Sequence, residues 1–299
     1  MERVKPNTVI HYHAVIHRAL KYAVKTDLID VNPADKVDRP KKNEFTGNFY
    51  SKDEMNALFD AVRGSKIEVA VMLTAFYGLR RSEVVGLKWA AVDFEQNTIE
   101  ICHTVTTVRL DGKEVLVESN GTKTKSSKRT LPLVPVFRER LLALQEEQKE
   151  NRKLCGRCYN KKYADYICVD AMGNLLKPDY LSNSFQIILQ NYHLRRIRFH
   201  DLRHTAATNM HQLTGDFYTV GEVLGHTLAG IGVSLGLSMT FEAVTARYVD
   251  VRLERKKEVL DAYHGAVKQA DPAKAEKAEP KKAKSAKSTA KKKSSDSEL

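Results

Sequence analysis

An apolar run from residue 67 to residue 77 marks the centre of any fold that this chain can adopt. Its side chains are apolar nearly all round, which predicts a helix that is buried on every side. Gly78 ends the run, because glycine readily takes the backbone conformation that closes a helix. Arg80 follows at once, and a second helical run covers residues 82–89. The sequence therefore places a charged side chain at a break between two helices.

A second stretch, residues 198–205, reads Arg-Phe-His-Asp-Leu-Arg-His-Thr and is typical of a loop that enters a helix. Asp201 falls in the first turn, where the helix dipole favours negative charge. His200 and Arg203 are three residues apart, so they lie on one face of the helix. This pair suits a phosphate, because the guanidinium can bind two oxygens while the imidazole exchanges a proton near neutral pH. By itself the pair is a weak signal.

Two further segments extend the pattern toward the C-terminus. His226 follows a helix-ending glycine, and Tyr248 lies in the short amphipathic run Thr-Ala-Arg-Tyr-Val-Asp. Cleavage of a phosphodiester without a cofactor requires a nucleophile, positive charge on the non-bridging oxygens, a proton acceptor and a proton donor. The chain offers candidates for each, in the order Arg, His-x-x-Arg, His and Tyr.

In these motifs and in their order, residues 5–262 resemble the tyrosine recombinase (phage integrase) family, and most closely the integrases of conjugative transposons and related prophages. The resemblance implies a metal-independent enzyme in which Tyr248 attacks one DNA strand and forms a 3′-phosphotyrosyl link. It also implies that Glu83 supports the first arginine. The catalytic residues that the resemblance implies are Tyr248, Arg80, Lys123, His200, Arg203 and His226.

Within this set, the two arginines would clamp the phosphate, and His200 would act as general base or orient the nucleophile. His226 would donate a hydrogen bond to the phosphate, whereas His204, one turn after His200, is interpreted as structural. The pKa of a tyrosine is ordinarily about 10, so the nucleophile needs a cationic pocket to ease its deprotonation. Tyr218 precedes His226 and Tyr263 lies far beyond it, which leaves Tyr248 as the best match.

For the general acid and for the first arginine of the clamp, a neighbouring residue of the same type is an alternative. The general acid should be a lysine in the basic loop after residue 120, where the Lys-Thr pair of the family favours Lys123 and a shift of two residues would select Lys125. Arg81 competes with Arg80, and the family spacing Gly-x-Arg-x-x-Glu selects Arg80.

The predicted fold class is α+β: a mainly helical catalytic domain with a small three-stranded antiparallel sheet, preceded by a truncated helical core-binding domain. Strands are predicted over residues 99–108, 114–118 and 129–133, with a hairpin turn at Asp111-Gly112. Helices are predicted over residues 7–25, 137–151, 180–192 and 252–264, and from residues 51, 200, 219 and 241. The predicted domains are a core-binding remnant (1–38), a linker (39–49), the catalytic domain (50–265) and a disordered Lys-rich tail (266–299).

The formal net charge of +12 over 299 residues favours a polyanionic partner, nucleic acid first. The basic residues predicted to contact DNA are Lys125, Lys128, Arg129, Arg39, Lys41 and Lys42. Four cysteines are too few and too unevenly spaced for a disulfide scaffold, and they suit a reducing compartment. No apolar run reaches the roughly 20 residues that span a bilayer, and the N-terminus does not begin a signal peptide. A cytoplasmic location is therefore expected.

Neither a cofactor nor a metal is expected. Cys155, Cys158 and Cys168 invite a zinc interpretation, but only three thiols lie nearby and no second ligand pair follows. The chain also lacks a Walker-type phosphate loop. None is needed, because a phosphotyrosyl link would conserve the bond energy for rejoining.

The predicted function is site-specific DNA recombination that integrates or excises a mobile element, either a transposon or a prophage. The resemblance implies a homo-tetramer on double-stranded DNA, at the element ends, the target site and a four-way junction, with an accessory excision factor as a further candidate partner. It also implies that the helix over residues 252–264 docks on a neighbouring protomer. The alternatives are a type IB topoisomerase-like enzyme and a truncated, non-catalytic DNA-binding regulator.

Residues 227–241 depart from the family, which has only a short link between the last histidine and the tyrosine. The insertion carries Gly230, Gly232 and Gly236, with apolar residues between them. It is interpreted either as a flexible tether or as a short β-hairpin that packs on DNA or on a neighbouring subunit, since exposed apolar clusters usually mark contact surfaces.

Overall fold

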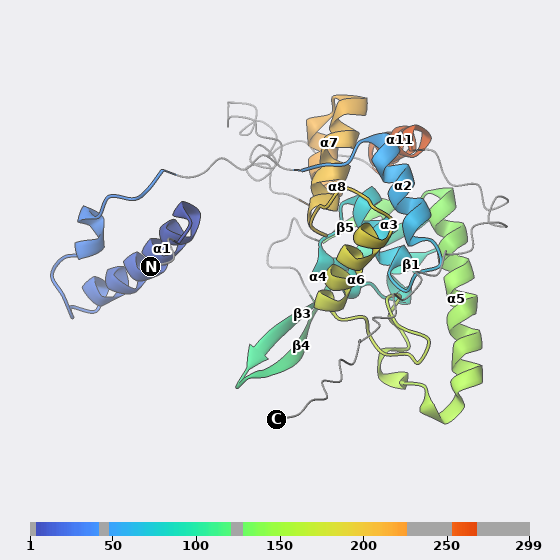
Figure 1. The fold of residues 1–299 in the computed structure, drawn as a ribbon, viewed down its shortest axis with the longest axis horizontal. Coiled ribbons are helices and arrows are strands. Elements are labelled where there is room, and N and C mark those ends of the chain that lie inside the picture. The colour runs from blue at the N-terminus through green and yellow to red at the C-terminus, as the bar shows by residue number, and fades with distance from the viewer. Residues whose placement is uncertain (1–3, 42–47, 121–127, 226–252, 268–299) are drawn as a thin grey trace, which may run out of the picture.

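The computed structural model describes residues 4–41, 48–120, 128–225 and 253–267 (Figure 1). Several predicted features lie outside this part of the chain: the 227–241 insertion, the helix expected from residue 241 and nearly all of the tail. The predicted site residues outside it are Lys42, Lys123, Lys125, His226 and Tyr248.

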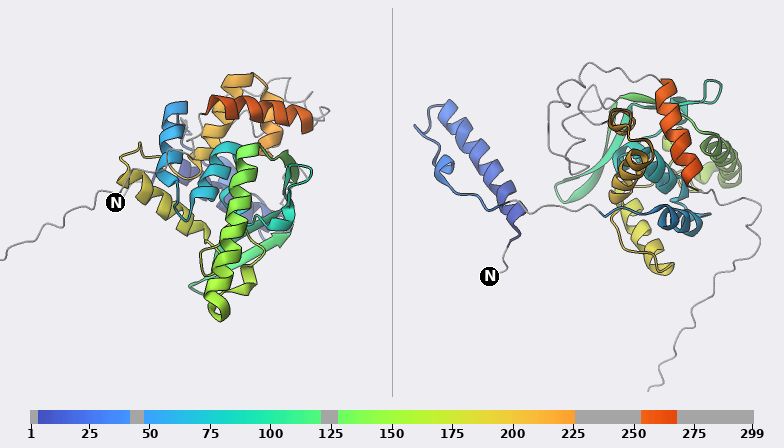
Figure 2. Two further views of the ribbon diagram at one scale, coloured as in Figure 1. Left: turned by 90° about the vertical axis from the view of Figure 1, so that its right-hand side faces the viewer. Right: turned by 90° about the horizontal axis from the view of Figure 1, so that it is seen from above.

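The N-terminal segment consists of helix α1 (Pro6–Lys25) and the short 3-10 helix η1 (Pro33–Lys36), which confirms the predicted helix. Their contact is polar: His17 Nε2 lies 2.6 Å from Asp35 Oδ1. In Figures 1 and 2 this segment lies apart from the main body, and none of the residues of α1 is buried. Its identity as a core-binding remnant stays a prediction.

Helix α3 (Glu68–Tyr77) forms the centre of the body, as its apolar run predicts. All of its residues except Met72 are buried. It contacts α2 (Lys52–Val62), α4 (Arg81–Val85) and α7 (Asp201–Thr214). Gly78 ends α3 in the left-handed conformation with φ of 65°. A Cβ atom at this position would lie 2.2 Å from Leu224 Cδ2, so the close packing of α3 requires glycine here.

One side of the body is covered by the long helix α5 (Pro135–Cys155), which extends the helix predicted over residues 137–151 (Figure 1). Its apolar face packs through Phe137, whose ring centroid is 4.9 Å from that of Phe76 in α3. Arg140 joins the two helices at the surface by donating to Glu68 over 3.1 Å. The segment after α5 contains the short helices η4 (Gly156–Cys158) and η5 (Lys161–Tyr163).

The antiparallel sheet has three strands, but not the three that were predicted. It contains β1 (Val92–Asp93), β2 (Thr98–Ile101) and β5 (Arg129–Pro132), with β2 in the centre. Strands β3 (His103–Leu110) and β4 (Lys113–Asn120) form a separate two-stranded ribbon that projects from the body (Figure 1).

The predicted strand over residues 99–108 is therefore split at Cys102. Both edges of β2 are already paired, by β1 on one side and β5 on the other, so the chain beyond Cys102 pairs with the return strand alone. The predicted turn is confirmed: Asp111 and Gly112 have φ values of 49° and 77°, as a two-residue hairpin turn with positive φ at both positions requires.

The remaining helices are α6 (Pro178–Asn191), α7, α8 (Phe217–Leu224) and α11 (Leu253–Ala266). The helix predicted over residues 252–264 is confirmed as α11, and its docking on a neighbouring protomer stays a prediction. Val259, Leu260 and Tyr263 are buried within this chain, where α11 contacts α7, α8 and β5. Aromatic packing contributes to this contact, because Tyr263 stacks on Phe76 of α3 with 5.1 Å between ring centroids.

Within the described residues, no helix combines the length and the apolar character that crossing a membrane requires. All four cysteines lie in the described ranges, and they are free thiols.

Candidate active site

Arg80 lies at the turn between α3 and α4, and its side chain folds over Glu83. Its backbone N–H and its Nη1 donate to the two carboxylate oxygens over 2.9 and 2.7 Å. Its Nη2 donates to the carbonyl of Gly225 over 3.2 Å. The Arg80 side chain is 35% exposed, so its guanidinium is anchored in the interior and still reaches solvent.

Glu83 is bound by a second arginine, Arg129 at the start of β5. Arg129 Nη2 and Nη1 donate to the two carboxylate oxygens over 3.0 and 3.3 Å. Its Nε donates to the carbonyl of Val223 at the end of α8 over 2.7 Å. The Arg129 side chain is 2% exposed. The sequence predicts a DNA contact for Arg129, whereas the structure places its guanidinium in the interior, where it joins α4 to α8.

The Glu83 carboxylate is held in its charged form by these arginines. Burial by itself would raise the pKa of Glu83. The opposing charge and hydrogen bonds of Arg129, followed by those of Arg80, outweigh burial and lower the pKa to about 2. Glu83 is therefore ionised at neutral pH and orients two guanidinium groups at once.

Arg203 projects from the first turn of α7 toward the same place. Its Nη2 donates to the carbonyl of Leu224 over 2.7 Å, and its Nη1 donates to the carbonyl of Gly78. Burial, and after it the charges of Arg80 and Arg129, lower the pKa of Arg203 to about 9. The group thus stays cationic at neutral pH and adds to a concentration of positive charge inside the body.

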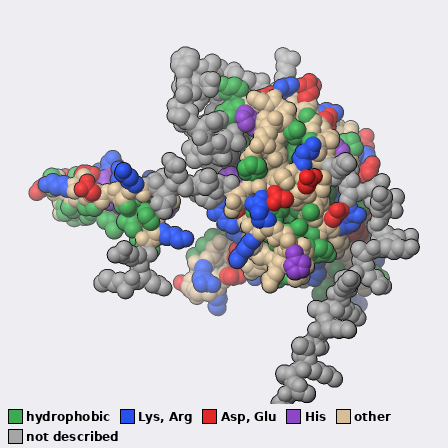
Figure 3. All heavy atoms as spheres, turned by 45° about the horizontal axis from the view of Figure 1, so that its top comes forward, with side chains coloured by type: hydrophobic (Ala, Val, Ile, Leu, Met, Phe, Trp, Pro, Cys, Tyr) green, Lys and Arg blue, Asp and Glu red, His purple; other side chains and the backbone are tan. Residues whose placement is uncertain are grey.

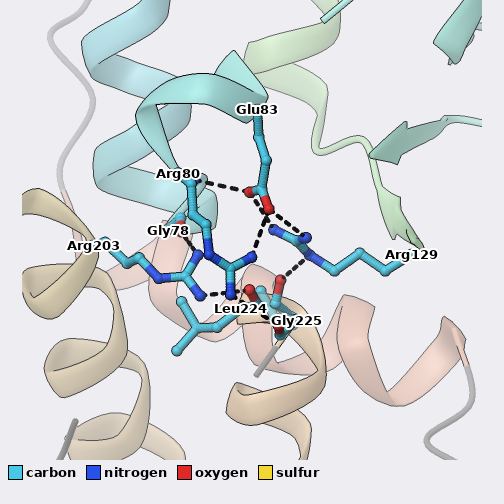
Figure 4. Close-up of polar contacts among 8 residues, drawn as sticks. Gly78, Arg80, Glu83, Arg129, Arg203, Leu224 and Gly225 are labelled. Carbon is cyan, nitrogen blue, oxygen red and sulfur yellow. Dashed lines mark hydrogen bonds and ion pairs between the residues drawn. The ribbon is translucent and has the colours of Figure 1, made fainter. Parts of the chain in front are cut away.

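The turn that ends α8 brings the three arginines together (Figure 4). The consecutive carbonyls of Leu224 and Gly225 accept from Arg203 and Arg80, respectively. Gly225 has φ of 65°, and a Cβ atom there would lie 2.7 Å from Arg129 Nη1. Only glycine fits this turn without strain. The next residue is His226, so the backbone leads from the arginine cluster directly to the predicted hydrogen-bond donor.

His200 precedes α7 and is the N-cap residue of that helix. Its ring lies edge-on to that of His204, with 5.4 Å between centroids. Although the His200 side chain is partly open to solvent, desolvation, the neighbouring His204 and the charge of Arg203 lower its pKa to about 4. The imidazole is therefore neutral at pH 7 and can accept a proton, as a general base must.

We expect the NMR titration of His200 to report a pKa below 5 in the protein without DNA. Because this pKa lies below the ordinary value of 6.5, the neutral form is favoured by folding, and the contribution of His200 to stability is lost as the pH falls from 6.5 toward 4. The His200→Gln variant identifies the resonance among the ten imidazoles of the chain. A pKa at or above 6.5 would contradict this environment.

A groove of about 820 Å³ opens beside His200. The side chains along it are mostly basic or amide-bearing, with a few apolar and hydroxyl groups and one carboxylate, that of Asp201, which is paired with Arg198 over 2.6 Å. Its lining residues are Asn48, Arg81, Ser182, Asn183, Gln186, Arg196, Ile197, Arg198, Phe199, His200 and Asp201. Arg81 points away from the arginine cluster and donates to Ser182 and Asp179 of α6 over 2.7 and 3.1 Å.

The structure separates the predicted DNA-contacting residues. Lys128 is 66% exposed and pairs with Glu100 over 3.0 Å, while Arg39 and Lys41 are exposed in the N-terminal segment. The sequence analysis did not select the groove arginines Arg81, Arg196 and Arg198. The basic run Arg-Arg-Ile-Arg directly before Phe199 and His200 was the available signal.

In the described ranges, no group of three His, Cys, Asp or Glu side chains is placed to hold a metal ion. Cys158 is exposed and Cys168 is buried, and burial raises the pKa of the Cys168 thiol to about 12. Such a thiol stays protonated near neutral pH and makes a poor zinc ligand.

The body is mainly helical and holds three arginines close together, two of them bound to one buried carboxylate, beside a neutral imidazole. The family model for the phage integrase family matches residues 48–231, more than half of the chain. The chain belongs to this family.

Individual relatives are tyrosine recombinases. The XerC-like tyrosine recombinase of Caldanaerobacter subterraneus subsp. tengcongensis is 27% identical over 195 residues, which are 62% of this chain and 49% of that protein. Tyrosine recombinase XerC of Pediococcus pentosaceus is 29% identical over 219 residues, which are 69% and 63% of the two chains. The matches thus span about half to just under two thirds of these relatives' lengths.

Solved structures share the fold. The Tn1549 transposon integrase in complex with a circular intermediate DNA superposes with a TM-score of 0.64 at 19% identity, over 82% of this chain and 79% of that one. The same integrase in complex with transposon right end DNA gives a TM-score of 0.63, also at 19% identity, over the same shares of the two chains. These likenesses confirm the mainly helical tyrosine-recombinase fold with small antiparallel sheets.

Proposed function

We propose that this chain is a site-specific DNA recombinase that cleaves and rejoins strands through a 3′-phosphotyrosyl intermediate. The observation that carries the proposal is the anchoring of Arg80 and Arg203 on the consecutive carbonyls of residues 224 and 225. Two guanidinium groups held side by side can both donate hydrogen bonds to the non-bridging oxygens of one phosphodiester. Membership of the phage integrase family supports the same activity.

In the proposed reaction, the Tyr248 oxygen attacks the scissile phosphorus, and the bond from phosphorus to the 5′-oxygen of the next nucleotide breaks. His200, neutral at pH 7, takes or directs the phenol proton, and Lys123 gives a proton to the departing oxygen. The products are a 3′-phosphotyrosyl link and a free 5′-hydroxyl. Attack by the 5′-hydroxyl of a partner strand reverses these steps and joins the new strand.

The arginines would act in the transition state, where the negative charge on the phosphate oxygens is greatest. Negative charge grows on the non-bridging oxygens as the fifth bond to phosphorus forms, and donors already fixed in place stabilise it without reorganisation. Glu83 fixes Arg80, and the carbonyls of Gly78 and Leu224 fix Arg203. We infer that this pre-orientation is the main contribution of the described residues to the rate.

The groove beside His200 is the proposed path of the DNA strand that leads away from the cleaved bond. Arg81, Arg196 and Arg198 supply charge for phosphates, while Asn183 and Gln186 on α6 offer amide groups to base edges or sugars. Figure 3 shows one face of the body, on which several Lys and Arg side chains reach the surface among Asp and Glu side chains. The net charge of +12 favours the same partner.

Replacing Arg81 and Arg196 together with Gln is expected to weaken DNA binding mainly at low salt. Each lost phosphate contact should reduce the slope of log K against log salt by about 0.9. The matched control is Arg157→Gln, an exposed arginine on η4 that does not line the groove. Fluorescence anisotropy at several salt concentrations measures the slopes. A double variant with the native slope would place the DNA elsewhere.

A nicked suicide duplex carrying an element end tests the proposed function. Cleavage releases a short fragment that cannot rejoin, so the covalent protein–DNA complex accumulates and appears as a slower band on a denaturing gel. A band that survives denaturation supports the enzyme. Specific DNA binding without any covalent band would instead indicate a non-catalytic regulator.

We also infer that strand exchange takes place in a homo-tetramer on a four-way junction, as two rounds of cleavage on two duplexes require. Because α11 packs on its own chain, contacts between protomers would have to come from other surfaces or from release of this helix. Exchange between two recombination sites, without relaxation of supercoiled DNA lacking a site, separates this assembly from a monomeric topoisomerase-like enzyme.

A further inference from the structure

Helix α7 carries a row of buried polar side chains that the proposed chemistry does not use. Asp201, Thr205 and Asn209 are 2%, 0% and 5% exposed, and their four-residue spacing places them on one face of the helix. Asp201 is satisfied locally by Arg198, whose backbone N–H donates to it over 2.8 Å. Buried polar groups nearly always have partners. Thr205 Oγ1 donates to the Asp201 carbonyl in its own helix over 3.0 Å, but the group that donates to it, and the acceptor of Asn209, lie in a distant part of the chain.

Both of these side chains hold the backbone of Tyr50. The Tyr50 N–H donates to Thr205 Oγ1 over 3.1 Å, and the Tyr50 carbonyl accepts from Asn209 Nδ2 over 3.2 Å. One residue is thus bound at its donor and at its acceptor by a single helix. Tyr50 lies where the chain enters the body from the N-terminal segment, directly before the capping box of Ser51 and Glu54.

The Tyr50 side chain is fixed as firmly as its backbone. Its ring is 1% exposed, and its phenol donates to the carbonyl of Arg195. The Arg195 guanidinium lies 5.0 Å from the ring centroid and donates to the carbonyl of Phe49 over 2.6 Å. Residues 49 and 50 are therefore held between α7 and the segment that leads to His200.

The helix of Asn209 also contacts a third segment. Helix α7 packs on α11, where the phenol of Tyr263 donates to the carbonyl of Ala75 in α3 over 3.2 Å. Helix α11 is the first described element after the segment that contains Tyr248. Asn209 thus joins the connection from the N-terminal segment to the helix of Arg203, and that helix in turn packs on the one that follows the proposed nucleophile.

We propose that Thr205 and Asn209 are positioning residues that couple DNA engagement by the N-terminal segment to the orientation of α7. Tyr50 cannot move relative to α7 without leaving buried polar groups unpaired, which is costly. A displacement of the connecting segment therefore moves α7, and His200 and Arg203 lie at the N-terminal end of that helix. This inference rests on the proposed recombinase function.

The test uses the full chain and two nicked suicide duplexes with the same cleavage site. One duplex is long enough to contact both the N-terminal segment and the body, and the other reaches only the body. At saturating DNA, the native chain should cleave the long duplex faster, by about tenfold if the coupling is of ordinary size. If the hydrogen bonds of Thr205 and Asn209 only stabilise the fold, their loss should lower stability and slow cleavage of both duplexes equally. If they couple the N-terminal segment to α7, their loss should change the ratio of the two cleavage rate constants.

Asn209→Leu, which keeps the number and branching of the side-chain heavy atoms, should bring the ratio of the two rate constants close to one and leave cleavage of the short duplex nearly native. Thr205→Val should lower the ratio in the same direction, and it leaves the bond from Asn209 to the Tyr50 carbonyl intact. Thr205→Val also decides the question if Asn209→Leu does not fold. The matched control is Thr74→Val, a buried hydroxyl in α3 that bonds only within its own helix, to Ala70 over 2.8 Å. This variant should keep the native ratio.

A native ratio in the Thr205 and Asn209 variants would overturn the proposal. Equal cleavage of both duplexes by the native chain would overturn it as well. If the native chain forms a covalent complex with neither duplex, the recombinase function itself fails, which is a distinct outcome.

Discussion

Tyr248→Phe is expected to form no covalent complex with a nicked suicide duplex, while its dissociation constant for that duplex stays almost unchanged. Only the phenol oxygen is removed, and this is the atom that is proposed to attack phosphorus. The arginines that would bind the phosphate are anchored on Glu83 and on backbone carbonyls, so their placement does not depend on Tyr248. Binding and cleavage should therefore separate cleanly in this variant.

The described structure also limits which other tyrosines can act. The phenols of Tyr50, Tyr77 and Tyr263 are donors to backbone carbonyls, and burial raises the pKa of each. Tyr263 in particular is 0% exposed and cannot reach a phosphate from this position. Tyr218→Phe serves as the matched control and should cleave like the native chain. Covalent product from Tyr248→Phe would reassign the nucleophile.

Glu83→Gln is expected to lower the free energy of unfolding by about 3–5 kcal/mol, because it leaves Arg129 buried without its counter-charge. The carboxylate is 1% exposed and accepts from both Arg80 and Arg129. A neutral amide can accept at one atom only and offers donors where the arginines need acceptors. Cleavage should fall as well, by about 10²-fold, since Arg80 loses the group that orients it.

The pH dependence of stability supplies a second signature of Glu83. Its pKa in the folded chain is about 2, below the ordinary value of 4.5. The stabilisation is therefore complete above pH 4.5 and is lost as the pH falls toward 2. Glu83→Gln should lack this part of the acid transition in urea titrations followed by circular dichroism.

Adding Arg129→Met to Glu83→Gln tests the cause of the instability. Removing the unpaired buried cation should restore part of the lost free energy, so the double variant should be more stable than additivity predicts. A Glu83→Gln single variant within about 0.5 kcal/mol of the native chain would show that the pair contributes little.

Local chemistry made several elements predictable from the sequence. The all-round apolar character of residues 67–77 predicts the buried central helix, and a glycine after it predicts the end of that helix. The capping box at Ser51 and Glu54 forms as expected, with both hydrogen bonds present. The Asp111-Gly112 turn is likewise encoded by two adjacent residues. Each of these features depends on neighbours that are close in the sequence.

The features that the sequence did not predict depend on distant partners. Arg129 belongs to a basic loop and suggests a DNA contact, but its acceptor Glu83 lies 46 residues away. The division of the strand at Cys102 depends on which strands occupy the edges of β2, and β5 comes from beyond the ribbon. Thr205 and Asn209 read as ordinary polar positions on a helix until Tyr50, more than 150 residues earlier, is placed beside them.

The anchoring of Arg80 and Arg203 on the carbonyls of residues 224 and 225 bears on how such a chain tolerates insertions. Every described acceptor of these two arginines lies at or before Gly225. Arg80, Arg203 and their acceptors, here called the proposed phosphate cradle, are therefore all placed before residue 227, where the insertion begins. Extra residues there lengthen the path to the tyrosine without altering any of these anchors. The sequence of the cradle and the length of the segment from residue 227 to Tyr248 can thus change independently. Chains that differ in the length of this segment can share one cradle.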